Sequence, residues 1–451
     1  MTLRGRLHCA GALALGRRWR AHLREIEASR PEEIERRALT TLLPHALDHV
    51  PYYRDLGIPA ASLSSFPLLS REALRTEFAR LKSDDLARRR PSLASTGGST
   101  GEPVWVIHDR GFQQWDVAAE MYCFDQFFGM SPREYLRSRR VAIWHQRRLR
   151  AGTGLAKRLA VRILGQVLYV EPYRVLSDDR MTEVLRRINR HRPEVILAFA
   201  GTAFELAKHA RQVGIRMHSP RFVATSVETL FPMMRETIGD VFRCRVHNRY
   251  GAAEVGRIAA ECSHGNLHLV SFANHVEVLG DDGAPVGPGQ VGRVVVTSLH
   301  NLAMPLIRYD IGDLVRTSAS PCSCGHLLPT VDEIQGRVIH HFVRPDGSLV
   351  FGGNFVAMFY EHDWIIQFHV LQEDVDRIRI SYKRRPGSSV PPTAMERMTT
   401  IVRDLMGEGC RVLWEEVDAV PASPLGRRLH TRSLVWEEKI GGRITPGDDA
   451  A

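Results

Sequence analysis

Apolar residues recur at helical spacing in three parts of the chain. Leu, Ile and Ala are spaced over a charged background in residues 15–50, and a similar spacing returns in residues 110–130 and 178–191. Apolar positions three and four residues apart form one face of a helix, and that face packs against a core. The pattern therefore predicts helices over these ranges.

Short apolar runs between these helices have the length and composition of buried strands. They are "RVAIWH" at 140–145, "EVILAFA" at 194–200 and "RFVAT" at 221–225. Strands that alternate with helices along a chain are typical of α/β layers with parallel pairing.

The pattern changes in residues 266–316. Short apolar runs are separated there by Gly, Pro and Asp, as in "DDGAPVGPGQVG". Such punctuation predicts antiparallel strands in a barrel-like or hairpin-rich section.

A further module follows a boundary near residues 335–350. Two apolar strands, "DWIIQFHVLQE" and "DRIRISYKR", precede an amphipathic helix and a third strand, "RVLWEEV". This order predicts a compact ββαβ unit. The sequence as a whole thus predicts an α/β fold. A large N-terminal domain (1–338) combines α/β layers with a β-rich subdomain, and a small α+β C-terminal domain spans 339–445.

Composition narrows the class of protein. The chain has 451 residues, 44% of them hydrophobic, and a net charge of +10, which fits a globular protein that meets nucleic acid, a membrane surface or an anionic substrate such as a nucleotide. No basic run is interleaved with aromatics and no apolar run has the length of a membrane span, so neither nucleic acid nor a membrane span is expected. Seven cysteines, an odd number, indicate a reducing compartment, and we expect a cytoplasmic protein.

Three loops have residues suited to a nucleotide. In "TGGSTGEP", 96–103, glycines let backbone N–H groups converge on an anion, and Ser99 and Thr100 add hydroxyl donors; a flexible turn is the alternative. In "RYGAAEVG", 249–256, Tyr250 could stack on a planar ring and Glu254 could hold Mg²⁺, unless the segment is a plain strand–turn–helix junction.

The third loop is "PLIRYDIGDLV", 305–315. Asp313 follows a glycine between two apolar segments that are expected to be separate strands, where a fixed carboxylate can accept hydrogen bonds from two sugar hydroxyls. A hairpin turn is the alternative, because Gly-Asp is common in turns.

Cysteine and histidine also recur at short spacing. Cys262 and His268 lie in "CSHGNLH", and Cys322 and Cys324 lie in "CSCG". Three thiols and one imidazole suit a closed tetrahedral zinc site, which would be structural because no position remains for water. His264 and His326 are rival ligands, and three buried free thiols that never meet are the alternative to a metal site.

The order and spacing of the loops resemble the adenylate-forming superfamily, and within it the phenylacetate–coenzyme A ligase and capsule-biosynthesis (CapK-like) group. The matching segments, in order, are "HALDHVPYYRDLG", "STGGSTGEPV", "RYGAAEVG", "PLIRYDIGD" and "GRV". The resemblance spans about residues 30 to 435 and implies an adenylate-forming domain followed by a lid domain. Several relatives also carry a Cys/His set similar to the one here.

The resemblance implies a role for each matching residue. Glu254 would hold Mg²⁺ and Asp313 would grip the ribose. Residues that would contact ATP elsewhere are Thr96, Gly98, Ser99, Thr100 and Gly101 at the phosphates, Glu228, Tyr250 and Gly251 at the base, and Arg337 near the hinge to the lid. The implied cofactors are ATP and Mg²⁺, with structural Zn²⁺ beside them.

Three departures from the family pattern bear on activity. The C-terminal loop "PASPLGRRLHTRSLV" has Arg427 and Arg428 where relatives carry a catalytic lysine, and the planar guanidinium is no substitute for a compact ammonium. The segment "VIHH" lacks the usual acidic hinge residue. Val227 stands where relatives usually have a glycine beside the adenine.

The function implied is ATP-dependent activation of a small carboxylic acid as acyl-AMP, followed by transfer to coenzyme A, a carrier-protein thiol or an amine. Two alternatives remain: an adenylyltransferase that moves AMP to a hydroxyl acceptor, and a catalytically weakened nucleotide-binding homologue in a biosynthetic cluster. The acid, the acceptor and the oligomeric state, with a homodimer among the options, are not fixed by the sequence.

Overall fold

The computed structural model describes residues 18–58, 62–95, 104–143, 167–170, 178–337, 341–360, 362, 364–420, 430–436 and 438. They fall into two compact units, each described here by itself. The first comprises the described residues up to 311 together with 315–334, and the second comprises 312–314 and the described residues from 335 onward. The domain division predicted after residue 338 stays a prediction.

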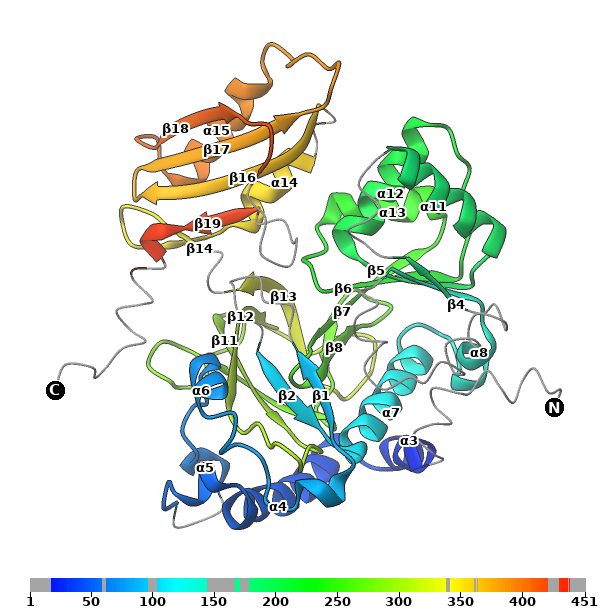
Figure 1. Cartoon of the computed structure of the whole chain (residues 1–451), viewed down its shortest axis with the longest axis vertical. Helices are drawn as coiled ribbons and strands as arrows, with labels where there is room; N and C mark the ends of the chain where they lie inside the picture. Colours follow the sequence, from blue (N-terminus) through cyan, green and yellow to red (C-terminus); the bar gives the residue numbers. More distant parts are fainter. Residues whose placement is uncertain are drawn as a thin grey trace. The chain divides into compact units, whose positions relative to one another are not determined.

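One large mixed sheet organises the first unit (Figure 1). Its eleven strands lie in the order β10-β11-β12-β13-β9-β8-β7-β6-β5-β3-β4. The strands are β3 (Arg140–Ile143), β4 (Val167–Val170), β5 (Val195–Phe199), β6 (Phe222–Ser226), β7 (Arg245–Ala252), β8 (Gly256–Glu261), β9 (Leu267–Leu269), β10 (Asn274–Leu279), β11 (Val291–Ser298), β12 (Tyr309–Thr317) and β13 (Thr330–Arg337).

The sheet changes character at β7. On one side, β4, β3, β5, β6 and β7 pair in parallel, as the alternation of strands and helices predicts. On the other side, β7 pairs antiparallel with β8, β8 with β9, and β9 with β13. The section predicted to be barrel-like or hairpin-rich therefore extends the same sheet, because β7 offers its second edge to β8.

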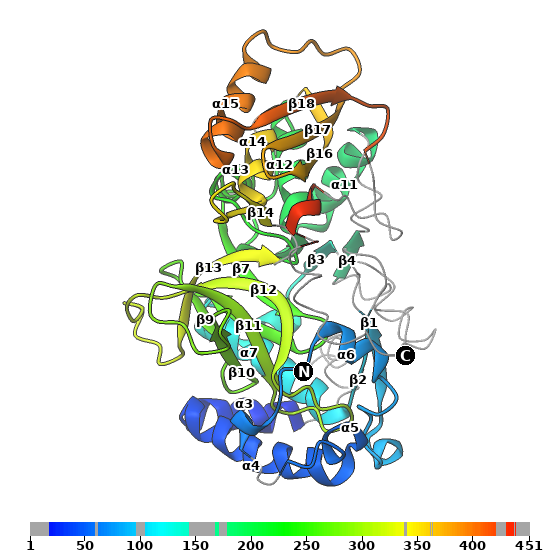
Figure 2. The ribbon, with the colours of Figure 1, turned by 90° about the vertical axis from the view of Figure 1, so that its left-hand side faces the viewer.

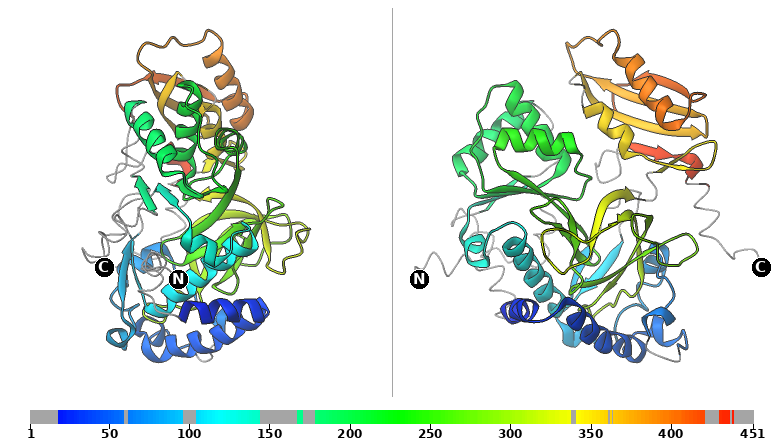
Figure 3. Two further views of the ribbon diagram at one scale, coloured as in Figure 1. Left: turned by 90° about the vertical axis from the view of Figure 1, so that its right-hand side faces the viewer. Right: turned by 180° about the vertical axis from the view of Figure 1, so that it is seen from behind.

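Helices flank the parallel strands. α11 (Asp178–His191), α12 (Ala200–Gln212) and α13 (Pro232–Phe242) gather beside β4 to β7 (Figures 1 and 3). α11 spans the range predicted from the sequence, since Met181, Val184, Leu185 and Ile188 form its buried stripe. Acidic residues in its first turn and basic residues in its last turn also complement the helix dipole.

The N-terminal helical range is divided in two. α3 (Arg18–Ala28) ends before Pro31, and α4 (Pro31–His49) starts at that proline, which suits a first helical position because its missing N–H needs no partner there. The unit's remaining elements are α5 (Pro51–Arg54), η1 (Leu63–Ser65), α6 (Arg71–Thr76), η2 (Leu86–Arg89), β1 (Ser92–Ser95), β2 (Trp105–His108), α7 (Arg110–Gln126) and α8 (Pro132–Arg137).

Two buried clusters hold these layers together. One joins α4, α5 and β2 to the β7–β12 region and includes Tyr53, Ile258 and Tyr309. The other joins α3 and α7 to the sheet and includes Trp19 and Phe124. The hairpin between β7 and β8 thus has packed side chains on both faces.

A half-buried ion-pair network ties α7 to that hairpin. Arg257 of β8 pairs with Asp116 and, at 2.7 Å, with Glu120, while Arg249 of β7 lies 3.6 Å from Glu120. Burial works against the charge of Arg257, but the two carboxylates raise its pKa above the ordinary value. For Arg249 burial outweighs the attraction of Glu120, and it lowers the pKa of this guanidinium below the ordinary value.

The second unit contains a four-stranded sheet in the order β18-β17-β16-β19 (Figure 2). Its elements are β14 (His341–Val343), β15 (Leu349–Phe351), α14 (Gly353–Tyr360), β16 (Ile365–Asp374), β17 (Arg377–Arg384), α15 (Ala394–Met406), β18 (Arg411–Glu416) and β19 (Thr431–Ser433). The predicted ββαβ order is present as β16, β17, α15 and β18.

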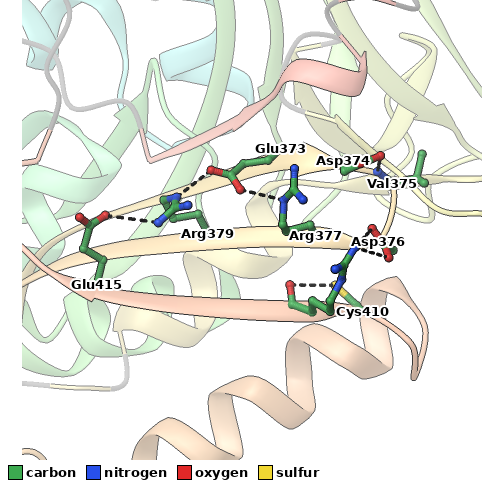
Figure 4. Close-up of polar contacts among 9 residues, drawn as sticks. Glu373, Asp374, Val375, Asp376, Arg377, Arg379, Cys410 and Glu415 are labelled. Atoms are coloured by element: carbon green, nitrogen blue, oxygen red, sulfur yellow. Dashed lines mark hydrogen bonds and ion pairs between the residues drawn. The ribbon is translucent and has the colours of Figure 1, made fainter.

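The two faces of this small sheet differ. Phe359 of α14 stacks on Phe368, and Trp414 of β18 donates its indole N–H to Thr399 of α15, so both helices cover one face. The other face carries a ladder of charges (Figure 4). Glu373 accepts from Arg377 at 3.0 Å and Arg379 at 2.7 Å, and exposed pairs of this kind add little stability.

Within the part of the chain that the structure describes, every helix is too short or too polar to cross a lipid bilayer.

The Arg257 network predicts a stability effect. Arg257→Ala would remove this cation from Asp116 and leave Glu120 with Arg249 alone, at 3.6 Å, and removing one partner of a buried pair costs roughly 3–5 kcal/mol. Because the Arg257 side chain is 26% exposed, we expect about 2 kcal/mol, measured as the change in unfolding free energy in urea.

Arg80→Ala is the matched control, because Arg80 pairs with Asp55 at 2.9 Å on the surface. Its effect should be too small to measure. Equal losses of unfolding free energy in the two variants would show that the Arg257 network stabilises the fold no more than an exposed ion pair does.

Candidate functional site

The residues singled out around Tyr250 lie beyond the carboxyl end of the parallel strands. β6 ends at Ser226, and its register with β7 ends at Thr225 opposite Asn248. β7 continues to Ala252 and turns into β8, so Tyr250 and Glu254 project past the edge. Ligands of open α/β sheets bind in the crevice outside the carboxyl ends of the strands. Residues 249–256 form a strand–turn–strand from β7 to β8, so the strand–turn–helix junction considered for "RYGAAEVG" is wrong.

Gly251 is required by a close approach between two strands. A Cβ at this position would lie 2.6 Å from the carbonyl oxygen of Gly256 and 3.4 Å from the Cα of Arg257. The β7–β8 ladder shifts register between Tyr250 and Gly251, which marks a local irregularity. The absence of a side chain at Gly251 therefore allows the close approach of the neighbouring strand, and Tyr250 beside it is 9% exposed.

Glu254 is buried in a polar setting. Its side chain contacts residues of α6 and β12, and the residue is 3% exposed. Oε1 accepts from the hydroxyl of Tyr309 at 3.3 Å and from the Arg71 guanidinium at 3.5 Å. Nε2 of His108 lies 3.0 Å from the Glu254 carbonyl oxygen. These two side-chain contacts fall on one carboxylate oxygen, Oε1.

Arg71 and His108 were missed by sequence reasoning. Arg71 begins α6 after Ser70, which caps that helix, and His108 ends β2; neither belongs to a motif. Tyr309 does lie in the quoted "PLIRYDIGDLV" segment, and its being the one aromatic residue of that segment was the available signal.

Glu228 binds the start of a helix. Its Oε2 accepts from the backbone N–H of Gly201 at 2.7 Å, in the first turn of α12. A carboxylate is favourable there because helix N-termini carry partial positive charge. Glu228 and Gly201 thus lie at the carboxyl ends of β6 and β5, on the same edge as Tyr250.

Asp313 lies in the middle of one strand rather than between two. It is half-buried in β12, directly after Gly312, whose φ of +76° interrupts the regular strand conformation. Arg337 is the last residue of β13. The other candidates, Thr96, Gly98, Ser99, Thr100, Gly101, Arg427 and Arg428, lie outside the described residues.

Cys262, His268, Cys322 and Cys324 come together. One ligand atom from each lies within 4.8 Å of the others. The Cys262 and Cys322 sulfurs are 3.7 Å apart, and Nε2 of His268 is 3.2 Å from the Cys324 sulfur. Tetrahedral zinc with Zn–S bonds of about 2.3 Å places sulfurs ~3.8 Å apart, so the spacing suits that geometry.

The surroundings orient these ligands. Nδ1 of His268 lies 3.0 Å from the Leu328 carbonyl oxygen, so donation there leaves the Nε2 lone pair facing the sulfurs. Asn266 and the Cys324 backbone N–H both donate to the Cys322 sulfur, at 3.1 and 3.5 Å. Burial opposes the Cys322 thiolate, but these hydrogen bonds and those from its cysteine neighbours lower its pKa.

The rival ligands are placed differently. His264 is exposed, with Nδ1 at 3.3 Å from the Ser263 hydroxyl. His326 contacts the rings of Phe127 and His268 edge-on. Among the described residues, neither belongs to the group of four.

Comparisons with known proteins agree with the motifs. No family model matches the chain. It is 20% identical over 386 residues to Protein CapK of Staphylococcus aureus, covering 82% of this chain and 80% of that protein. It is 30% identical over 157 residues to a phenylacetate–coenzyme A ligase of Thermus thermophilus, covering 33% of this chain and 35% of that protein.

Solved structures establish the fold. A 2-hydroxyisobutyryl-CoA ligase in the postadenylation state, in complex with R3-HIB-AMP, matches with a TM-score of 0.67 at 16% identity over 92% of both chains. An anthranilate CoA ligase in complex with anthranoyl-AMP matches with a TM-score of 0.53 at 14% identity, over 78% of this chain and 66% of that one. The resemblance to adenylate-forming enzymes and the α/β fold class are confirmed.

The close approach at Gly251 predicts a second stability effect. In Gly251→Ala the new Cβ meets backbone, which cannot rotate away as a side chain could, so β7 and β8 must separate. We expect a loss of about 1–3 kcal/mol in unfolding free energy, measured in urea.

Gly239→Ala in α13 is the control. The nearest atom to its added Cβ is at 3.5 Å, an ordinary contact, and alanine favours a helix over glycine. This variant should be neutral or slightly stabilised. A Gly251→Ala variant as stable as the wild type would contradict the tight contact between the strands.

Proposed function

We propose that the chain is an adenylate-forming ligase that activates a small carboxylic acid with ATP and passes the acyl group to a nucleophile. A carboxylate oxygen attacks the α-phosphorus of ATP, the bond to the β-phosphate oxygen breaks, and pyrophosphate leaves. The thiol of coenzyme A, a carrier thiol or an amine then attacks the acyl carbon, and AMP leaves. The acceptor loses its proton in this second step.

One observation carries the proposal. The Tyr250–Glu254 turn projects past the carboxyl edge of the parallel strands, next to the ends of β5 and β6. This edge is where an α/β sheet binds its ligand. The relatives named above are phenylacetate–coenzyme A ligases and CapK, and the fold is that of structures holding acyl-AMP.

The proposed nucleotide contacts follow the resemblance of the sequence motifs to adenylate-forming enzymes. Tyr250 and Gly251 contact the base, Glu228 supports that region through α12, and Asp313 accepts hydrogen bonds from the ribose. The loop with Thr96, Gly98, Ser99, Thr100 and Gly101 contacts the phosphates. Arg337, Arg427 and Arg428 add positive charge near the α-phosphate, and without a lysine we expect slower adenylation than in relatives that have one.

Glu254 would hold Mg²⁺ through its carboxylate. Mg²⁺ prefers carboxylate and phosphate oxygens, and the contacts of Glu254 with Arg71 and Tyr309 both use Oε1. Arg71, at 3.5 Å, balances the charge of the carboxylate without the metal. When bound, the ion would offset the charge that develops on the phosphoryl oxygens.

The Cys262, His268, Cys322 and Cys324 group would hold a structural zinc ion. The donor types and the 4.8 Å spread suit it, as do the N–H donors to Cys322. Four protein ligands leave no position for water, so zinc would join the β8–β9 turn to the loop before β13 and take no part in the chemistry.

Pyrophosphate exchange tests the activity. With a panel of aryl, fatty and amino acids, at least one acid should support ATP–pyrophosphate exchange. Asp313→Ala should raise the KM for ATP about 10- to 100-fold, since hydrogen bonds to a charged group are worth about 1.5–3 kcal/mol.

Asp332→Ala, on an exposed residue of β13, is the control and should leave KM within about twofold. A folded preparation that exchanges with none of the acids would count against the proposal. Formation of an AMP ester on an alcohol, seen by mass spectrometry, would instead favour the adenylyltransferase alternative.

Metal analysis tests the zinc site. Protein purified without chelators should contain about one zinc per chain, and Cys324→Ser should contain far less while Cys244→Ala, which alters a cysteine outside the group, retains it. Removal of the metal should lower the thermal midpoint. A metal-free wild-type protein whose midpoint does not respond to zinc would refute the site.

A further inference from the structure

Val227 adopts a backbone conformation that a valine avoids. Its φ is +79°, in the left-handed region where the Cβ of an L-residue meets backbone. The other non-glycine residues with positive φ among those described, Arg90, Arg192, Arg243 and Arg308, are unbranched at Cβ. A β-branched side chain adds a second γ carbon to the clash, so Val227 is the most strained of the five.

The backbone is fixed on both sides of Val227. Thr225, two residues before, is fully buried, and its hydroxyl donates to the His247 carbonyl oxygen at 3.3 Å. Glu228, the next residue, is fixed by the N–H of Gly201 at 2.7 Å. Strained residues persist where their surroundings determine the backbone, and they cluster at functional sites. The chain must therefore bend sharply at residue 227, whatever its side chain.

The side chain at this bend faces outward. Val227 is 46% exposed although it follows a strand whose first four residues are buried. Exposure gives the two methyl groups no compensating burial in the core. Core packing therefore does not explain why this position holds a valine rather than a glycine, which would adopt the same φ without strain.

Val227 lies at the edge of the sheet that carries Tyr250. β6 and β7 pair in parallel, with Phe222 opposite Arg245 and Thr225 opposite Asn248. β6 ends at Ser226, so Val227 directly follows its carboxyl end, while Tyr250 lies two residues beyond Asn248 on β7. An exposed apolar side chain and an aromatic residue thus lie at the carboxyl edge where the base is proposed to bind.

We propose that Val227 is a specificity-determining residue that narrows the base site and restricts which nucleotides enter it. This inference rests on the proposed function, since it assigns Val227 to the same nucleotide site. The side chain supplies an apolar wall at the carboxyl edge that carries Tyr250, and the strained backbone is the consequence of placing a branched side chain at a bend that suits glycine. A smaller side chain should admit a larger base.

Two variants separate side-chain size from backbone strain. Val227→Ala removes two methyl groups but keeps a Cβ at positive φ, whereas Val227→Gly removes both the wall and the strain. Calorimetry on the full chain would measure the Kd for ATP and for two base-enlarged probes, N6-benzyl-ATP and 8-bromo-ATP. No acid substrate is needed for this measurement.

The expected result is a change in the ratio of Kd values. For at least one probe, the ratio of its Kd to that of ATP should fall about tenfold or more in Val227→Gly, with Val227→Ala between the two, since pocket methyls discriminate by about 10- to 200-fold. The thermal midpoint should rise by about 2 °C in Val227→Gly alone. A wild type that binds no ATP beside a Val227→Gly variant that does would also support the proposal.

Unchanged ratios for both probes, in three proteins that all bind ATP, would overturn the role of Val227 while leaving the proposed function intact. A rise in thermal midpoint without a change in ratio would lead to the same conclusion, because it would show a purely structural bend. If none of the three proteins binds ATP, the proposed function itself fails, and this inference fails with it.

Discussion

The rest of the first unit depends on the double pairing of β7. This strand bonds in parallel to β6 along one edge and antiparallel to β8 along the other. Parallel strands need crossover connections such as helices, whereas antiparallel strands need only turns. β7 is the strand at which the parallel part of the sheet passes into the antiparallel part. Because β7 is longer than β6, its last residues leave the parallel ladder while they remain paired to β8. A rigid hairpin therefore carries Tyr250 and Glu254 past the sheet edge, where a flexible loop would not hold them.

Opposite faces of this hairpin are fixed by different forces. Arg249 and Arg257 pair with the carboxylates of α7. The Coulomb energy of these ion pairs increases as burial shields them from water. On the other face, Tyr250 joins an apolar cluster, and Glu254 meets Arg71 and Tyr309. Residues adjacent in sequence thus serve different faces, as strand geometry requires. The combination limits movement of the Glu254 carboxylate, which is the condition for a metal ligand or any positioned charge.

The same sheet brings the four cysteine and histidine ligands together. Cys262 follows β8 and His268 lies in β9, while Cys322 and Cys324 lie in the segment between β12 and β13. Because β13 pairs with β9, with Thr330 opposite His268, the ladder aligns residues 62 positions apart in sequence. The sheet thereby supplies most of the geometry that zinc would fix, and the metal would hold a loop that has few apolar side chains of its own.

Local pattern determined the elements and the chemistry available to them. The spacing of Met181, Val184, Leu185 and Ile188 was sufficient to bound α11, because it depends on near neighbours in sequence. Residue types indicated the cysteine and histidine group, but the structure was needed to separate its four candidate ligands from the rivals His264 and His326. Only the tertiary structure decided which strands pair. It merged the β-rich section into one sheet through β7, placed Arg71 and His108 at Glu254, and set the left-handed bend at Val227. Those outcomes depend on contacts between residues far apart in the chain, and no local pattern encodes which distant strand edge or side chain a residue will meet.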